Sequence, residues 1–316
     1  MELKDIEDFK NKYNADLFFN TDIKKLNWFN IGGKSKIFFK PKNLIELKEF
    51  LKLYNNRGKM FILGMGSNVL FKDNTYEGVI IKLSNNFSTL SKLKPDTIIA
   101  GSACSQKKLS EFALENGISG FEFMYCIPGS VGGGLQMNSG CFGTEFKDKL
   151  ISLQCIDTKG NIKVIPSNKI KFQYRKIELN ENLIFLSATF KGDLLNKNKI
   201  KNLMEELAIK KNNSQPSKIK TGGSTFKNPI EQTKKKAWEL IKESVPENIN
   251  FGDACISKKH SNFFVNKNNA SFDEMNSLIN FVKKNVKDKT GININLEIKI
   301  IESVSYTHLR AHETHE

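Results

Sequence analysis

Two glycine-rich segments are the residues best suited to bind a large phosphate-bearing molecule. The longer one, residues 127–143, reads IPGSVGGGLQMNSGCFG; it is too glycine-rich for a core element and too apolar for a disordered linker. The shorter one, residues 64–68, reads GMGSN. Glycine has no Cβ and adopts backbone angles closed to other residues, so the main chain can approach a ligand closely. Two such segments predict a large cofactor lying across both, whereas either alone would indicate an ordinary tight turn.

The shorter segment lacks two familiar phosphate-binding fingerprints. Val69 stands where the dinucleotide motif G-x-G-x-x-G needs its third glycine, and the polar residues 72–74 lead toward another strand instead of a helix. This segment contains no G-K-S/T sequence, and the full pattern G-x-x-x-x-G-K-S/T occurs nowhere in the chain, which excludes the P-loop. The turn instead offers backbone amides together with the Ser67 hydroxyl and the Asn68 amide. This is a nest suited to a diphosphate without a helix dipole.

Histidine and cysteine usage argues against zinc and triad chemistry. Three of the four histidines fall in residues 303–316, which continue no apolar period and are expected to be a dispensable, non-native extension. The remaining one, His260, is interpreted as a domain-packing residue, so neither zinc ligands nor the base of a triad are available. The five cysteines show no C-x-x-C pairing and are predicted to be reduced, half-buried small hydrophobes: Cys104, Cys126, Cys141, Cys155 and Cys255.

Composition places the chain among ordinary soluble proteins. It has 316 residues, 39% hydrophobic and 26% charged, enough for two or three domains. No apolar run approaches the ~18 residues of a membrane helix, and the first residues lack a signal peptide, so a cytoplasmic location is predicted. The net charge of +15 comes almost entirely from dispersed lysines, with only three arginines. Nucleic-acid recognition favours arginine, so we expect no nucleic-acid partner and only a general attraction for small anions.

The apolar pattern predicts an α+β protein with a domain boundary near residue 195. Residues 1–26 are predicted to be a helical lead-in. Strands are predicted at 36–40, 60–63, 78–83, 97–100, 151–157, 162–165, 183–191 and 292–301. Helices are predicted after Pro41, after Ser105, at 200–207, at 237–241 and after the capping box of Ser271 and Glu274, with a loop at 212–220.

Several short segments with unusual residue combinations are spread along the chain. They are NWFNIGG at 27–33, GMGSNVLFKD at 64–73, the glycine segment at 127–143, YR at 174–175, GSTFKNP at 223–229, KHSNF at 259–263 and LE at 296–297. In order and spacing they resemble the UDP-N-acetylenolpyruvoylglucosamine reductases of bacterial cell-wall synthesis, from about residue 20 to 302. The resemblance implies a two-lobed FAD-binding domain of the vanillyl-alcohol-oxidase (PCMH) class at 27–194 and a smaller α/β substrate-binding domain at 195–302. No long substrate lid is expected between Gly192 and Gly223, which is typical of the shorter of the two family types.

The resemblance also implies an activity. Such an enzyme uses NADPH and FAD to reduce the enolpyruvyl group of UDP-N-acetylglucosamine enolpyruvate, giving UDP-N-acetylmuramate for peptidoglycan synthesis. By motif position, Ser224 is the implied proton donor, Arg175 binds and polarises the substrate carboxylate, and Glu297 assists from the other side. Substrate binding is implied for Tyr174, Lys227 and Asn228.

The two glycine segments become the implied FAD contacts. These are Gly64, Gly66, Ser67, Asn68, Pro128, Gly129, Ser130, Val131, Gly132, Gly133, Asn138 and Gly140. FAD is expected to be non-covalent, because covalent attachment in this fold class uses histidine or cysteine and no histidine lies in residues 1–259. Cys126 and Cys141 are the only exceptions to consider. We expect a monomer that binds no membrane. Two alternatives remain: another FAD oxidoreductase of this fold, of the alcohol oxidase type, and a non-enzymatic binder of nucleotides or polyanions.

Overall fold

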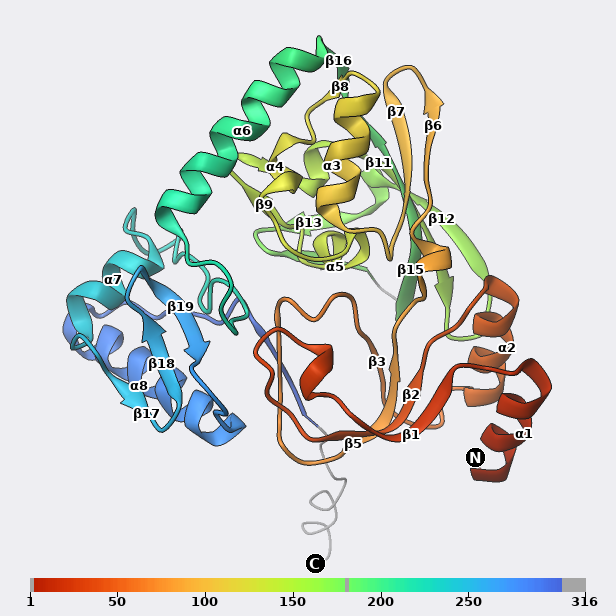
Figure 1. Cartoon of the computed structure of the whole chain (residues 1–316), viewed down its shortest axis with the longest axis horizontal. Coiled ribbons are helices and arrows are strands. Elements are labelled where there is room, and N and C mark those ends of the chain that lie inside the picture. Colours follow the sequence, from red (N-terminus) through yellow and green to blue (C-terminus); the bar gives the residue numbers. More distant parts are fainter. Residues whose placement is uncertain (1–2, 180–181, 303–316) are drawn as a thin grey trace, which may run out of the picture.

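The computed structural model of the chain describes residues 3–179 and 182–302. The predicted extension at 303–316 lies outside the described residues. Figure 1 shows three groups of elements: an N-terminal lobe in red and orange, a second lobe that is mainly yellow and green, and a C-terminal unit in blue. Within the described part of the chain, no helix is both long and apolar enough to cross a membrane.

The N-terminal lobe is a four-stranded sheet with two helices packed on it. Its elements are α1 (Leu3–Tyr13), β1 (Leu17–Asp22), η1 (Lys24–Leu26), β2 (Lys34–Phe39), α2 (Leu44–Tyr54), β3 (Met60–Ile62) and β5 (Tyr76–Ile81). The strand order is β1-β2-β5-β3, with β1 antiparallel to β2 and the other pairs parallel. Phe9, Phe39 and Phe50 bring their rings together from α1, β2 and α2, with centroids 4.3–5.8 Å apart. These rings form the centre of the lobe's core.

Sequence predictions for this lobe are mostly confirmed, with one clear error. The strands predicted at 36–40, 60–63 and 78–83 are present as β2, β3 and β5. The helical lead-in predicted over 1–26 is confirmed only for α1, because the residues after α1 form β1, which pairs with β2 along its length. α2 starts three residues later than Pro41, because the side chain of Asn43 accepts a hydrogen bond from the Glu46 amide and caps it.

The second lobe is a five-stranded antiparallel sheet covered by helices. Its strand order is β12-β11-β15-β7-β6. The strands are β6 (Leu90–Lys94), β7 (Thr97–Gly101), β11 (Leu150–Asp157), β12 (Ile162–Pro166) and β15 (Leu183–Lys191), and the predicted hairpin of β11 and β12 is confirmed. Shorter strands are β8 (Ile118–Ser119), β9 (Gly140–Cys141), β10 (Thr144–Glu145), β13 (Lys171–Gln173), β14 (Lys176–Glu178) and β16 (Asp193–Leu194). Its helical elements are η2 (Asn85–Phe87), α3 (Gln106–Glu115), α4 (Glu122–Tyr125), α5 (Val131–Gln136), η3 (Phe146–Asp148) and η4 (Ser167–Lys169).

The long glycine segment contains a core helix, contrary to the sequence-based expectation. Within α5, Val131 and Leu135 are fully buried against the sheet. A Cβ at Gly134 would lie 2.6 Å from the ring of Phe146. Glycine therefore lets this helix pack closely against the lobe's core as well as leaving room for a ligand.

The C-terminal unit packs helices on a small antiparallel sheet of order β17-β18-β19. Its elements are α7 (Ala237–Ser244), β17 (Asn250–Phe251), β18 (Ala254–Ser257), β19 (His260–Asn266) and α8 (Phe272–Thr290). The predicted capping box of Ser271 and Glu274 starts α8, and Gly291 ends it in the left-handed conformation. The preceding helix, α6 (Lys197–Ser214), packs against α3 and α4 of the second lobe and runs into the predicted loop at 212–220.

A seam of main-chain and side-chain bonds joins the C-terminal unit to the N-terminal lobe. Strand β20 (Lys299–Ile301) pairs in parallel with β4 (Val69–Phe71), which directly follows the shorter glycine turn. Asn266 Nδ2 donates to the Phe29 carbonyl at 2.9 Å, and the Phe272 amide donates to Asp73 Oδ2 at 2.7 Å. The strand predicted over 292–301 is therefore present only in its last three residues, because residues 292–298 bury side chains between the units and form only an isolated bridge.

Candidate active site

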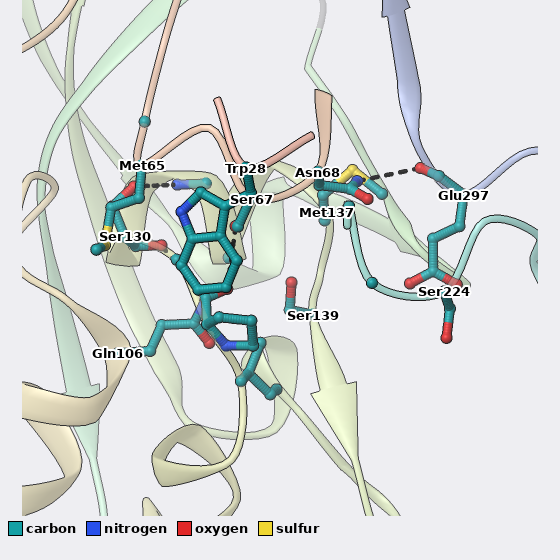
Figure 2. A pocket seen from close by; sticks show the side chains of 18 of the residues that line it. Trp28, Met65, Ser67, Asn68, Gln106, Ser130, Met137, Ser139, Ser224 and Glu297 are labelled. Carbon is teal, nitrogen blue, oxygen red and sulfur yellow. Dashed lines mark hydrogen bonds between the residues drawn. The ribbon is translucent and has the colours of Figure 1, made fainter. Parts of the chain in front are cut away.

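A cleft of about 1650 Å³ is lined by residues from all three groups of elements. Both glycine segments, residues 211–224 and the side chains of Tyr174, Arg175 and Glu297 contribute to its walls. Figure 2 shows how residues far apart in the sequence, such as Trp28, Ser130 and Glu297, lie around it. The fold thus brings together most of the residues that the sequence singled out.

The two glycine turns contact each other and form one cradle. Ser67 Oγ donates to the Pro128 carbonyl at 3.2 Å. A Cβ at Gly64 would lie 2.6 Å from Ser130 Oγ, and one at Gly129 would lie 3.0 Å from Ser67 Oγ. Larger residues at these glycines would therefore push the two turns apart.

The free hydrogen-bond donors of the cradle lie on the shorter turn. Within the described part of the chain, the amides of residues 64–67 have no acceptor. The first amides of α5 are already used, because Val131 donates to Cys104, Gly132 to Ser102 and Gly133 to Ser130 Oγ. Main-chain donors that line a cleft without partners fit the diphosphate of a dinucleotide. The residues of the cradle therefore fit a cofactor such as FAD.

A cluster of charges centred on Arg175 also lines the cleft, next to the glycine segments. Its Nε lies 3.2 Å from Glu297 Oε1, its Nη1 lies 3.3 Å from Glu145 Oε1, and its Nη2 donates to the Gly140 carbonyl at 2.7 Å. The guanidinium stacks over the Tyr174 ring at 4.9 Å. The backbone of Arg175 is in the left-handed region, with φ of 56°, which is uncommon for a residue with a long side chain. Several contacts thus hold this cation in one place.

Glu297 and Ser224 both line the cleft, and their chain segments are joined through the residue that follows Ser224. The Glu297 amide donates to the Thr225 carbonyl at 2.8 Å, and Asn68 of the glycine turn donates to the Glu297 carbonyl at 3.1 Å. Burial raises the pKa of the Glu297 carboxyl, an effect opposed by the charge and hydrogen bond of Arg175. Gly223, with φ of 78°, turns the chain so that Ser224 lines the cleft. The Ser224 hydroxyl and the Glu297 carboxyl, whose pKa burial raises, therefore both line the cleft.

Comparisons with known proteins agree with this geometry. Residues 35–165 match the model of an FAD binding domain, and residues 215–301 match the model of the UDP-N-acetylenolpyruvoylglucosamine reductase C-terminal domain. The chain is 57% identical over 302 residues to the UDP-N-acetylenolpyruvoylglucosamine reductase of Pelagibacter ubique, covering 96% of this chain and all of that one. It is 40% identical to the reductase of Rickettsia bellii, covering 94% and 96% of the two chains. The chain belongs to the UDP-N-acetylenolpyruvoylglucosamine reductase family.

A solved structure supports the same assignment. The crystal structure of the family's reductase from Thermus caldophilus matches with a TM-score of 0.77 at 27% sequence identity, covering 90% of this chain and 98% of that one. The predicted family, the FAD-binding fold, the flavin cofactor and the class of enzyme are confirmed. The predicted division near residue 195 and the roles of individual residues stay predictions.

Three residues predicted from the family motifs do not line the cleft. Val131 is buried in the core of the second lobe. Asn138 is also fully buried, where its side chain donates to Glu145 and Gln173 and accepts from the Lys147 amide. Lys227 likewise lies outside the lining. The glycine-rich pattern does not distinguish side chains facing the core from those facing a ligand, so it grouped the first two with true cleft residues.

The other predicted substrate residues, Tyr174 and Asn228, line the cleft, whereas Lys227 lies outside its lining. Burial raises the pKa of the Tyr174 hydroxyl, and burial together with nearby Lys299 lowers the pKa of Lys227. Asn228 Oδ1 accepts a hydrogen bond from the Ala237 amide at 3.0 Å, so part of its capacity stabilises α7. His260 lines the cleft and contacts the rings of Trp238 and Phe263.

The structure adds cleft residues that sequence reasoning missed. Trp28 is 41% exposed at the cleft and donates its amide to Gly66. Glu145 and Lys299 also line the cleft. Two of these residues had a sequence signal: Trp28 lies inside the NWFNIGG motif, and Glu145 lies just after the longer glycine segment. Lys299 had none. None of the five cysteines, which all lie among the described residues, forms a disulfide; Cys104, Cys126 and Cys155 are buried instead of half-buried as predicted.

Proposed function

We propose that this chain is the NADPH- and FAD-dependent reductase that converts UDP-N-acetylglucosamine enolpyruvate into UDP-N-acetylmuramate for peptidoglycan synthesis. The observation that carries the proposal is that Arg175, Glu297 and Ser224 line the same cleft as the glycine cradle. A hydride donor held by the cradle and a proton donor near Arg175 would act on two faces of one double bond. Reduction of an enolpyruvyl group needs this arrangement.

Arg175 binds the carboxylate of the enolpyruvyl group in this proposal. Hydride addition next to a carboxylate generates an enolate-like dianion, so the largest gain in negative charge is at that carboxylate. A guanidinium already fixed by Glu297, Glu145 and Gly140 meets this charge without reorganising. Preorganised charge of this kind is worth more in the transition state than in the ground state.

Ser224 delivers the proton to the second vinyl carbon. A serine hydroxyl is a weak acid, so it needs either a strongly basic acceptor or a neighbour that replaces its proton. We assign this task to Glu297, because its amide bonds to the carbonyl of the residue after Ser224 and burial raises the pKa of its carboxyl. The pair then acts as a short relay in which the carboxyl holds the proton and the hydroxyl places it.

Cofactor binding falls to the shorter glycine turn and the start of the longer one. The unpartnered amides of residues 64–67 and the Ser67 hydroxyl would hold the FAD diphosphate, while Gly129, Ser130 and α5 border the rest of the molecule. When bound, FAD supplies the hydride that it has taken from NADPH. The proposal includes the sequence-based expectation of a cytoplasmic monomer without nucleic-acid or membrane partners.

The decisive experiment measures which substrate drives turnover. The purified protein should be yellow, and NADPH oxidation should depend on the enolpyruvyl sugar, with one sugar reduced per NADPH consumed. An alcohol oxidase of this fold would instead consume oxygen in the presence of an alcohol and ignore the sugar. A colourless protein that binds nucleotides or polyanions without turnover would overturn the proposal in favour of a binding role.

A further inference from the structure

Glu145 is the most completely anchored acidic side chain at the cleft, and nothing in the proposed reaction yet uses it. It belongs to β10 and its side chain is 19% exposed. Oε1 lies 3.3 Å from Arg175 Nη1, while Oε2 accepts from Asn138 Nδ2 at 3.0 Å and lies 2.9 Å from Lys147 Nζ. Both carboxylate oxygens are therefore fixed, one toward the cleft and one away from it.

We infer that Glu145 is a positioning residue that holds the Arg175 guanidinium in the orientation required to bind the substrate carboxylate, an inference that rests on the function proposed above. A guanidinium has five N–H donors in a rigid plane. Three of them are used by Glu297, Glu145 and Gly140, so one N–H remains on each terminal nitrogen. Those two remaining donors suit a carboxylate, which accepts two parallel hydrogen bonds from arginine.

The anchors around Arg175 differ in what they can contribute. Gly140 offers a neutral main-chain carbonyl, and Glu297 is assigned to proton delivery, so its charge changes during the reaction. Glu145 has no such task, and its carboxylate lies 3.3 Å from Nη1. It therefore fixes the plane of the guanidinium while Glu297 changes protonation.

Charge balance explains why Lys147 contacts Glu145. Two carboxylates on one guanidinium would leave a net negative site that repels an anionic substrate. Lys147 compensates for Glu145, so Lys147, Glu145, Arg175 and Glu297 alternate in charge and sum to zero when all four are ionised. Protonation of Glu297 makes the group positive. Other charged or titratable groups around it are Tyr174 and Lys227 beside Glu297, Cys141 beside Arg175, and Asp148 beside Lys147 and the Glu145 amide.

Loss of the Glu145 charge should also change how Glu297 titrates. Glu145 is a like charge near Glu297 and it shares the cation that Glu297 uses. Without it, Arg175 would pair more fully with Glu297, and both effects favour the ionised carboxyl. Activity that requires protonated Glu297 falls as the pH rises, so this alkaline fall should move to lower pH in Glu145→Gln.

The test compares Glu145→Gln with the matched control Glu178→Gln. Glu178 lies on the nearby strand β14, is ion-paired with Lys171 and Lys176, and does not line the cleft. In Glu145→Gln, reoxidation of the reduced enzyme by the enolpyruvyl sugar should slow ~10²-fold. Flavin reduction by NADPH should stay within about twofold, since it involves no substrate carboxylate. Calorimetry should show weaker binding of the sugar to the oxidised enzyme, and Glu178→Gln should match the wild type in every measurement.

A double-mutant cycle with Arg175→Lys separates positioning from general damage. If Glu145 acts through Arg175, then Glu145→Gln should add little to the loss already caused by Arg175→Lys. Should Glu145→Gln fail to fold, Lys147→Gln tests the same arrangement, and its shift of the alkaline fall in activity should be in the opposite direction. Removing that exposed cation strengthens the field of Glu145 at Glu297, so the alkaline fall should move to higher pH.

Three outcomes would overturn the inference: fully additive losses, equal slowing of both half-reactions, or an unchanged pH profile in Glu145→Gln. Failure of the proposed function would look different, because the wild-type enzyme itself would then show no sugar-dependent oxidation of NADPH.

Discussion

The two walls of the cleft use different chemistry to recognise what they bind. The cradle wall is built from glycines, small hydroxyl side chains and unpartnered main-chain amides. The charged wall is built from side chains centred on Arg175 and Glu297, and it meets the glycine segments at Gly140 and Asn68. A main-chain surface recognises shape, so it fails when atoms are added. A charged surface recognises and moves charge, so it fails when one functional group is exchanged for another of similar size.

The sharpest way to test this contrast is Ser224→Ala on the charged wall. It removes one oxygen atom and adds none. If Ser224 protonates the substrate, reoxidation by the enolpyruvyl sugar should slow by the ~10²–10⁴-fold typical of lost acid catalysis. FAD binding and flavin reduction by NADPH should stay near normal. Stopped-flow absorbance of the two half-reactions measures both.

Ser224→Cys provides the control for that experiment. A thiol delivers a proton from the same position, so part of the lost rate should return. Equal slowing of both half-reactions in Ser224→Ala would instead make Ser224 a structural turn residue, and Glu297 would become the next candidate for the donor.

On the cradle wall, the corresponding change adds one carbon. Gly66→Ala would place a Cβ 2.2 Å from the Leu26 carbonyl oxygen and 2.7 Å from Asn27 Cα, at a φ of 72°. Gly291 has the same φ of 72° at the end of α8 with nothing within 4 Å, so Gly291→Ala carries the backbone cost alone, about 1–2 kcal/mol of unfolding free energy. Gly66→Ala should lose more stability than this, and its FAD affinity should fall by at least ~10-fold, or 1.4 kcal/mol.

Denaturant unfolding of the apoproteins and FAD titration measure these two quantities separately. Similar FAD affinity in Gly66→Ala and the wild type would show that the shorter turn is not part of the cofactor site.

A smaller effect is expected from His260, where a neutral side chain lines the charged half of the cleft. Burial lowers its pKa from the ordinary 6.5, so below that pH the unfolded chain binds a proton that the folded chain resists. The free energy of unfolding should therefore decrease as the pH falls below 6.5, by at most about 1.4 kcal/mol per pH unit. In His260→Gln this part of the decrease should disappear. If the free energy of unfolding depended on pH in the same way in both proteins, the decrease could not be assigned to His260.

The last prediction is that FAD is bound non-covalently, so replacing the cysteine Cys141 should leave the release of flavin unchanged. Burial raises the pKa of Cys126, and that of Cys141 to about 12, so both thiols stay protonated and poorly reactive. Acid precipitation should then release all the yellow colour into the supernatant, from wild type and from Cys141→Ser alike. Flavin retained by the wild-type pellet alone would identify Cys141 as an attachment site.

Sequence reasoning predicted well wherever one local signal determined the structure. The capping box at Ser271 and the hairpin of β11 and β12 needed only neighbouring residues to be recognised. The strand β1 was missed, because six residues with only Leu17 fully buried give a weak alternation next to a helix. The sheet of β17–β19 was missed for a related reason, since its first two strands are short and mostly half-buried.

In the candidate site, too, some residues could be predicted from local sequence motifs and others could not. Motifs brought Ser224, Arg175 and Glu297 to attention, and all three line the cleft. Glu145 was not predicted, because its role depends on its contact with Arg175. Arg175 is thirty positions further along the chain, and only the fold brings the two residues together. Val131 and Asn138 were included because they stand among glycines, although burial turns both side chains away from the cleft.

The pairing of β20 with β4 has a consequence for the order in which the enzyme matures during synthesis. Residues 299–301 pair with residues 69–71. Just before these two strands, Asn68 donates a hydrogen bond to the Glu297 carbonyl across the same seam. A contact between segments so distant in sequence forms late, since the chain between them must first be made and ordered. A nascent chain still attached to the ribosome at residue 250 would have both glycine turns but no strand beside β4 and no Glu297. The emerging protein should therefore remain catalytically silent until its final strand has left the exit tunnel and docked.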